Sequence, residues 1–189
     1  MLSRNFSFSD NRGETPLHVA ARHGHDEVFD YLIQLGANPN ARALQSIAPI
    51  HLAAENGHAD ILTALVLNDA SINCRAGPKQ LTPLHFAVKN GHFDATRLLI
   101  DCEANIRVRD ADDMTPIYYV ALFSQDVNIL KYLLCHGGNF EEKMPGSQQS
   151  NLHSAVLNGH YEAARFLLNC GAEVGKIIDP FLIVPLLML

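Results

Sequence analysis

Residues 15–25, Thr-Pro-Leu-His-Val-Ala-Ala-Arg-His-Gly-His, decide the fold of this chain, because their order matches the start, face and end of a short helix. Thr15 suits the N-cap, where its hydroxyl can accept a hydrogen bond from a first-turn backbone N–H. Pro16 suits the first helical position, where no donor is needed. Leu17, Ala20 and Ala21 stand at i, i+3 and i+4, so they form one narrow apolar face of the predicted helix. Gly24 can adopt positive φ, so we expect the helix to end there.

A second helix is predicted from about Asp26. Val28, Leu32 and Leu35 follow one another at the i, i+4 and i+7 spacing of an apolar helix face. Two acidic residues lie in its first turn, near the positive end of the helix dipole. Residues 36–40, Gly-Ala-Asn-Pro-Asn, end it in turn-forming residues. The predicted unit is therefore helix, tight turn, helix and loop.

The same pattern returns along the chain at a nearly constant spacing. The position of Thr15 recurs at Ala48, Thr82, Thr115 and Ser150, at intervals of 33, 34, 33 and 35 residues. The Pro-Leu-His start returns as Pro-Ile-His, Pro-Leu-His, Pro-Ile-Tyr and Asn-Leu-His, and the Gly-His turn returns in units two, three and five. Self-similarity at this period indicates an array of stacked repeats.

These motifs resemble the ankyrin repeat family, whose unit is two antiparallel helices and a hairpin-like loop over about 33 residues. The resemblance covers about residues 10–174 and implies an all-α ankyrin-repeat solenoid. The expected units are about 10–42, 43–74, 75–108, 109–142 and 143–174. Residues 1–9 are expected to form a partial N-terminal cap, and residues 175–189 form an apolar C-terminal tail.

Two units depart from the pattern. Unit two has Ala48 where threonine is expected, which should cost about 1 kcal/mol of helix capping. Unit four has Tyr118 in place of histidine, and residues 122–126 replace the Gly-His turn with one residue added. Its first helix is expected to be longer, or its turn to be reshaped.

The charge, the N-terminal sequence and the cysteines exclude several classes of function. A net charge of -6 and a pI near 5.9 leave no basic stripe, so we expect no nucleic-acid binding. The N-terminus has no apolar stretch typical of a secretory signal, so we expect a cytoplasmic location, with the nucleus as the alternative. None of the four cysteines forms a Cys-x-x-Cys pair, so we expect free thiols and no finger-type zinc site.

Ten histidines invite a metal or catalytic interpretation, but eight of them recur at two positions of the repeat. The resemblance implies that the histidine of the Pro-Leu-His start ties loop and helix together. Neutral imidazole suits this because it can donate from one nitrogen and accept at the other. A catalytic site would need different polar groups around one histidine. We expect no enzyme activity, no cofactor and no metal.

The apolar tail has three interpretations. It could fold over unit five as a cap, it could be the ending of a truncated or alternative form, or it could touch a membrane. From Ile177 there are 13 residues, interrupted by Asp179, Pro180 and Pro185, whereas a spanning helix needs about 20 apolar residues. Truncation combined with capping is favoured over the membrane.

The resemblance implies a protein-interaction module, acting as an adaptor, scaffold or stoichiometric inhibitor through a concave strip of loop tips and first-helix residues. We expect an unidentified protein partner and a monomeric chain. The alternative is a truncated or alternative form of a larger ankyrin-containing protein, such as a channel or a ubiquitin-ligase adaptor. The residues expected to contact the partner are Arg12, Arg22, His23, Leu44, Ile47, Lys79, Leu81, Lys89, Met114 and Phe123.

Large apolar groups in this set, such as Ile47 and Leu81, stand where polar residues are usual. They either pack under the loops or line an apolar groove flanked by cations, which would suit a partner carrying both apolar and acidic side chains. Asn40 and Asn73 occupy equivalent loop positions where, in ankyrin repeats, asparagine can be hydroxylated. Hydrogen bonding to the loop backbone is the favoured role for both.

Overall fold

The computed structural model describes residues 8–124, 126–144, 146 and 149–172. These residues contain ten α-helices arranged in five antiparallel pairs, together with a short 3₁₀ turn at Leu44–Ser46. The pairs are α1 (Pro16–His23) and α2 (Asp26–Gln34), α3 (Pro49–Asn56) and α4 (Ala59–Leu67), α5 (Pro83–Lys89) and α6 (Phe93–Asp101), α7 (Pro116–Phe123) and α8 (Val127–Cys135), and α9 (Asn151–Leu157) and α10 (Tyr161–Asn169).

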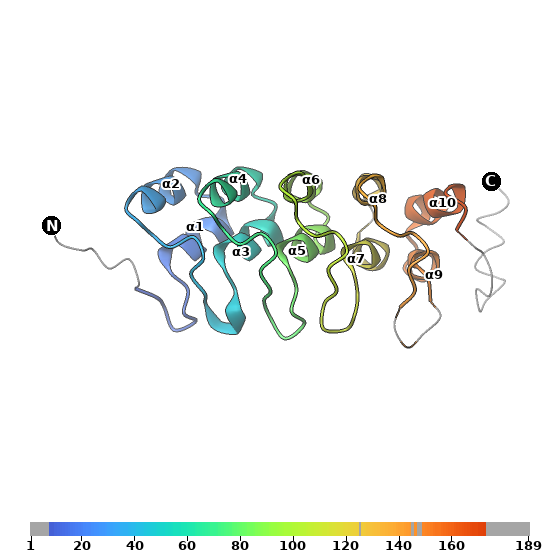
Figure 1. Cartoon of the computed structure of the whole chain (residues 1–189), viewed down its shortest axis with the longest axis horizontal. Helices are drawn as coiled ribbons and strands as arrows, with labels where there is room; N and C mark the ends of the chain where they lie inside the picture. The colour runs from blue at the N-terminus through green and yellow to red at the C-terminus, as the bar shows by residue number, and fades with distance from the viewer. Residues whose placement is uncertain (1–7, 125, 145, 147–148, 173–189) are drawn as a thin grey trace.

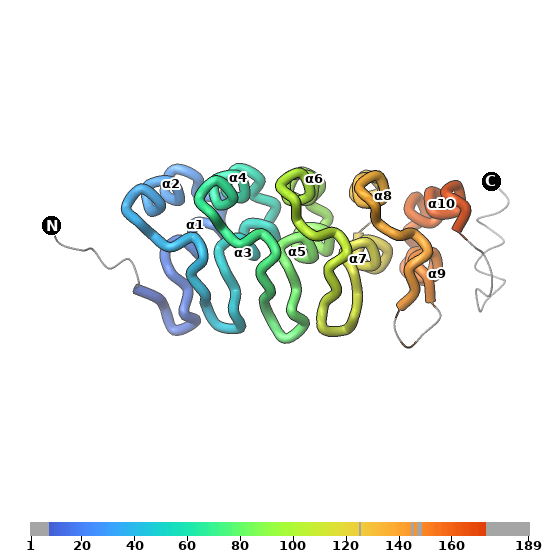
Figure 2. The backbone as a smooth tube through the Cα atoms, in the orientation of Figure 1, coloured from blue at the N-terminus to red at the C-terminus, as the bar shows by residue number. Residues whose placement is uncertain are grey.

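The helices form two parallel rows (Figure 1). The inner row contains α1, α3, α5, α7 and α9, each packed on the next, and the outer row contains the even-numbered helices. The loops between units extend from the inner row as a series of fingers on one side of the stack (Figure 2). In unit three the finger is closed by an antiparallel bridge between Ala76 and Leu81. The expected all-α solenoid is therefore confirmed.

Small side chains allow the inner helices to approach closely. The position five residues after the cap is Ala20, Ala53, Ala87, Val120 and Ala155 in successive units, and all five are buried. Together with leucines and isoleucines from both rows they form one hydrophobic cluster that runs through all five units. Each unit is therefore held by its neighbours, as in other repeat proteins.

The first recurring histidine caps the inner helices. Nδ1 of His51 lies 3.1 Å from the backbone N–H of Ala48, and its Nε2 lies 3.0 Å from the carbonyl of Cys74. Because Nδ1 accepts, Nε2 carries the proton and donates to the loop. His18 and His85 make the equivalent bonds. Burial lowers the pKa of His51 and of His85 to about 4, so both are neutral at physiological pH.

The expected hydroxyl cap at Thr15 is wrong in its detail. The Thr15 hydroxyl makes no bond to a first-turn N–H; it lies 2.9 Å from Nδ1 of His18, as the Thr82 hydroxyl does from His85. The imidazole takes over the capping because it reaches back to the N-cap N–H. Ala48 lacks the hydroxyl but keeps this imidazole bond.

Replacing Ala48 by Thr is therefore expected to raise the free energy of unfolding by about 1 kcal/mol, since it restores the hydroxyl bond to His51. Urea titration followed by circular dichroism measures the change. Ala48→Val has nearly the same shape without the hydroxyl and should give no comparable gain. Equal stabilisation by both substitutions would assign the effect to apolar packing instead.

The second recurring histidine links each unit to the one before it. Nε2 of His58 bonds the carbonyl of Arg22 at 3.0 Å, and His92 bonds Glu55 in the same way at 2.9 Å. The His58 ring lies over Gly24, whose φ is +70°, and a Cβ there would come within 2.6 Å of the ring. Glycine is needed both for its backbone conformation and for the space. Both histidine positions therefore have structural roles.

Unit four keeps the helix pair but changes its polar contacts. Its first helix, α7, is not longer than α1; the turn after it is reshaped, and Asp126 caps α8 by accepting from the N–H of Asn128. Tyr118 cannot cap as histidine does, and its hydroxyl accepts from Ser154 at 2.7 Å. Tyr119 donates to buried Asp110 at 2.7 Å. The tyrosines thus hold unit four by different bonds.

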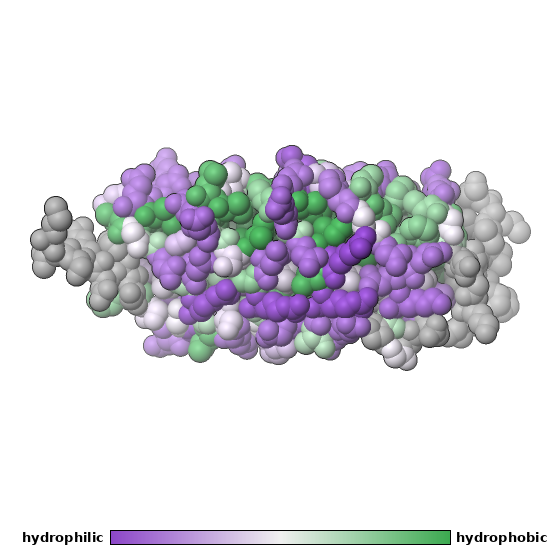
Figure 3. All heavy atoms as spheres, in the orientation of Figure 1, coloured by the Kyte–Doolittle hydropathy of each residue, from purple (hydrophilic) through white to green (hydrophobic). Residues whose placement is uncertain are grey.

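Arginines stabilise the loops between the units. Arg42, Arg75 and Arg109 each donate to a carbonyl of their own loop, and Arg109 also bonds Glu142. The face drawn in Figure 3 carries a band of hydrophilic residues along its lower half. The guanidinium groups thereby satisfy loop carbonyls that no helix pairs.

Two expectations fall on residues whose structure is not described. Residues 1–7 of the expected partial cap and residues 175–189 of the tail lie outside the described ranges. Among the described residues, no helix has both the length and the apolarity to cross a membrane.

Candidate functional site

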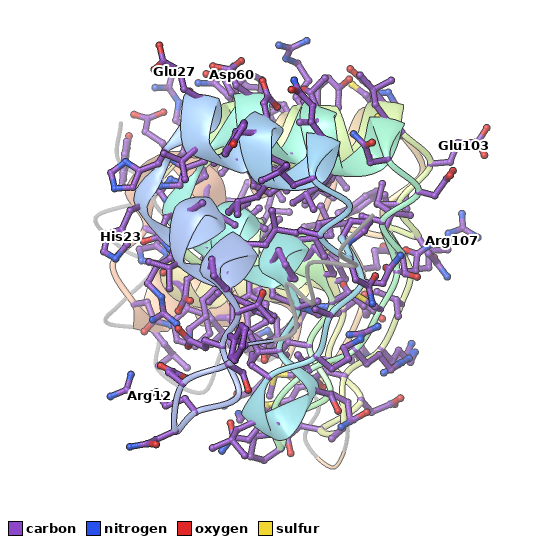
Figure 4. The ribbon with its side chains drawn as sticks, turned by 90° about the vertical axis from the view of Figure 1, so that its left-hand side faces the viewer. Arg12, His23, Glu27, Asp60, Glu103 and Arg107 are labelled. Carbon is purple, nitrogen blue, oxygen red and sulfur yellow. The ribbon has the colours of Figure 1, made fainter. Side chains whose placement is uncertain are left out.

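A groove of about 340 Å³ lies between the inner helices and the loop tips of the first three units. It is on the side where Arg12 and His23 project, opposite Glu103 and Arg107 (Figure 4). Its lining comes from α1, α3, α5 and the three loops that precede them. The lining residues are Arg12, Glu14, Arg22, Gln45, Ile47, Leu52, Glu55, Ala76, Gly77, Pro78, Lys79, Leu81 and Phe86.

The groove combines apolar walls with charged groups. Ile47 and Phe86 are partly exposed, and Leu52 is buried beside them. These three side chains come from one loop and two helices, so the apolar surface continues across unit boundaries. Such a surface can receive an aliphatic or aromatic side chain from a partner.

Three cations belong to the groove, and their partners differ. Arg22 is ion-paired with Glu14. Lys79 lies 2.9 Å from a carboxylate oxygen of Asp112, and this hydrogen bond is the main cause of the raised pKa of Lys79. Within the described residues, the Arg12 guanidinium makes no hydrogen bond or ion pair, and the residue is exposed. Arg12 is therefore the cation most able to receive an acidic group without breaking an existing pair.

The structure brings together five of the residues proposed from the sequence, namely Arg12, Arg22, Ile47, Lys79 and Leu81. Leu81, however, is only 7% exposed and belongs to the hydrophobic core. The expectation that it projects from the surface is corrected, because its backbone pairs with Ala76 in both directions and turns the side chain inward. It supports the groove rather than forming an accessible contact.

Lys89 and Phe123 form a second cluster farther along the stack. The Lys89 Nζ lies 5.8 Å from the centre of the Phe123 ring, within the range of a cation–π contact. Phe123 is 52% exposed, and its ring also meets that of Tyr119. This pair extends the concave side beyond the groove without lining it.

The remaining proposed residues are not gathered at the groove. Leu44 is exposed in the 3₁₀ turn, away from the lining, and His23 is exposed and stacks on His25 with ring centres 5.8 Å apart. Met114 is partly buried and packs against the core. For Met114 the structure favours the alternative of packing under the loops.

Two large apolar side chains of the groove were not proposed from the sequence. Leu52 and Phe86 follow the capping histidines His51 and His85 and occupy the register of Val19. Because this position faces the preceding unit, apolar residues there were interpreted as part of the hydrophobic core. The available signal was the increase in size from valine to leucine to phenylalanine at one position.

Asn40 and Asn73 hold adjacent units together. Asn40 donates to the carbonyl of Asp69 and accepts from the N–H of Ser71, both at 2.8 Å. Asn73 accepts from the N–H of Asn105 at 2.8 Å. The favoured backbone-bonding role is present, but the bonds reach the next unit rather than the same loop. Hydroxylation at these positions stays a prediction.

Metal-ligating side chains are dispersed. Within the described ranges, no three or more histidine, cysteine, aspartate or glutamate side chains come together in a way that could hold a metal ion. The four cysteines are free; Cys74 and Cys102 are partly buried, whereas Cys135 and Cys170 are exposed rather than packed as small apolar groups.

Comparisons with known proteins all find ankyrin repeats. Models of ankyrin repeats match residues 12–44, 50–144 and 124–168. The crystal structure of the human ASB11 ankyrin repeat domain superposes with a TM-score of 0.79 at 25% identity, covering 85% of this chain and 71% of that one. The ANK repeat-containing protein nipk-1 of Caenorhabditis elegans is 48% identical over 42 residues, which are 22% of this chain and 7% of that protein.

Proposed function

Because the chain belongs to the ankyrin repeat family, whose repeats generally bind other proteins, we propose that it is an interaction module that holds its partner in the groove over units one to three. The partner would be a protein segment that places an apolar side chain against Ile47 and an acidic side chain against Arg12. The module would act by binding alone, as an adaptor, scaffold or inhibitor in the cytoplasm.

The observation that supports this proposal is the pairing of an apolar wall with an available cation. Ile47 and Phe86 supply partly exposed apolar surface, and the exposed Arg12 guanidinium on the same groove makes no ion pair within the described residues. A partly desolvated apolar anchor beside an ion pair is typical of residues that dominate binding energy at protein interfaces. Lys89 and Phe123 would extend the contact to a longer segment.

A selection from displayed random linear peptides tests this proposal directly. The peptides retained by the wild-type chain should be enriched in an aromatic or aliphatic residue next to Asp or Glu. Fluorescence anisotropy with one such labelled peptide should show about tenfold weaker binding to Arg12→Glu and to Ile47→Asp, since each removes one of the two contacts.

Arg97→Glu is the matched control, because it makes the same charge change on the exposed surface of α6 in the outer row. It should bind the peptide with unchanged affinity. Circular dichroism must show that all variants remain folded. Selected peptides without acidic residues, or binding that Arg12→Glu and Arg97→Glu weaken equally, would overturn the proposed recognition.

A further inference from the structure

The N-terminal end of the stack exposes side chains whose counterparts in unit two are buried. Val28 of α2 is 52% exposed, whereas its counterpart Ile61 in α4 is 1% exposed. Val19 of α1 is 43% exposed, and its counterpart Leu52 is 3% exposed. The end face therefore has the composition of an internal junction, although no described unit covers it.

Pro16, His25 and a hollow over the end face also distinguish unit one from the later units. Pro16 is exposed, whereas Pro49, Pro83 and Pro116 at the same position are buried. Within the described part of the chain, the His25 imidazole makes no hydrogen bond, whereas those of His58 and His92 bond the preceding unit. A hollow of about 510 Å³ lies over this face, and its lining residues are Phe8, Ser9, Asp10, Glu14, Pro16, Val19, Ala20, His25 and Val28.

The view along the stack shows the helices of unit one at this end (Figure 4). Glu27 projects from the outer edge beside Asp60, its counterpart in unit two. Since Asp60 lies at an internal junction, an acid at this register does not oppose stacking. The charges around the end face are thus compatible with another unit.

The internal junctions define what such a face accepts. Between units one and two, the covering surface provides small side chains at Ala20 and Ala21, the helix-ending Gly24 and the carbonyl of Arg22 for His58. An occupant of the N-terminal face must supply the same set: small residues, a helix-ending glycine without a bulky neighbour, and a carbonyl near the end of its inner helix.

Unit five of this chain presents most of that set, namely Ala155 at the position of Ala20, the helix-ending Gly159 and the carbonyl of Leu157 at the position of Arg22, with Val156 in place of Ala21. Gly159 lies in the turn that follows α9 and has a φ of +71°. It is exposed to solvent, whereas its counterparts Gly24 and Gly57 are only partly exposed. Leu157, seven residues after its cap as Arg22 is after Thr15, is 61% exposed. Val156, the counterpart of buried Ala21, is only partly buried. The two ends of the described stack are therefore complementary to each other.

We propose that the N-terminal face binds a second copy of this chain, whose unit-five end continues the stack head to tail. His25 would lie over Gly159 of the second copy and donate to the carbonyl of its Leu157, as His58 does to Arg22. This inference is independent of the groove and differs from the monomer expected from the sequence. Association of this kind is heterologous and does not close, so the mass grows with concentration.

Sedimentation velocity across micromolar to hundreds-of-micromolar concentrations tests the proposal. The wild-type chain should form species larger than the monomer, in increasing amount. Val28→Asp should weaken association by about tenfold or more, because it places a charge in the contact. Asp in the first turn of a helix is compatible with the helix dipole, so the variant should stay folded. Leu67→Asp, at a site 78% exposed in α4, is the matched control.

A mixing experiment fixes the direction of stacking. Gly159→Asn blocks the space for the His25 ring at the other end of the chain, so each variant alone should associate at least about tenfold more weakly than the wild-type chain. An equimolar mixture of Val28→Asp and Gly159→Asn should form a dimer that grows no further, because each retains one intact end. Monomeric wild-type chain at every concentration, association unchanged by Val28→Asp, or a mixture that stays monomeric would overturn head-to-tail stacking.

Discussion

Leu81→Asp is expected to lower the free energy of unfolding by more than about 4 kcal/mol and to leave much of the chain unfolded in mild urea. Leu81 is 7% exposed and belongs to the core shared by all five units. The substitution removes its apolar contacts and places a carboxylate where no described cation contacts it. Urea titration monitored by circular dichroism, with the midpoint compared to wild type, measures the loss.

Ile47→Asp provides the comparison within the same groove. Ile47 is partly exposed, so its new carboxylate can remain hydrated, and the expected loss is about 1 kcal/mol. A Leu81→Asp variant as stable as Ile47→Asp would show that Leu81 is accessible after all. The two residues must therefore not be combined in one binding variant, since unfolding would be mistaken for lost recognition.

Acidification is expected to destabilise the fold between pH 6.5 and pH 4. Burial lowers the pKa of His51 and of His85 to about 4, so the unfolded chain takes up a proton at each histidine before the folded chain does. Stability is complete above pH 6.5 and decreases as pH falls, by about 1.4 kcal/mol per pH unit for each histidine. At pH 5 the two together should lower the free energy of unfolding by about 4 kcal/mol.

Urea titrations at pH 7.5, 6.5, 5.5 and 5.0, above the range in which most carboxylates titrate, measure this dependence. His85→Gln should be less stable than wild type at pH 7.5 but should lose less stability on acidification. His23→Gln is the control, because it makes the same substitution at an exposed histidine outside the core. Equal pH dependence in His85→Gln and wild type would show that His85 is not held neutral by the fold.

The periodic residues identified the fold and the structural histidines because their roles are local or recur at every junction. Thr15, Pro16 and Gly24 predict the limits of a helix from preferences of the backbone, and their counterparts confirm the register. Tyr118 and residues 122–126 indicated that unit four differs from the repeat pattern. Only the structure showed that the turn is reshaped and that α7 keeps the length of α1.

The candidate groove was predicted only in part. Arg12, Ile47 and Lys79 were identifiable because they vary at positions where the repeat tolerates change. Leu81 was misplaced because an apolar loop residue gives the same sequence signal whether it points outward or inward. Its direction depends on the backbone pairing with Ala76, which no periodic pattern specifies.

Sequence alone determined the repeat, the helix limits and the structural role of the recurring histidines, because each depends on short-range spacing that the units share. Tertiary structure decided which apolar side chains are accessible and that the first unit has an internal-type face at the end of the stack. Both depend on what lies against a residue in the neighbouring unit. At Val28 and Ile61 the register is the same, and only the presence of a preceding unit makes one exposed and the other buried.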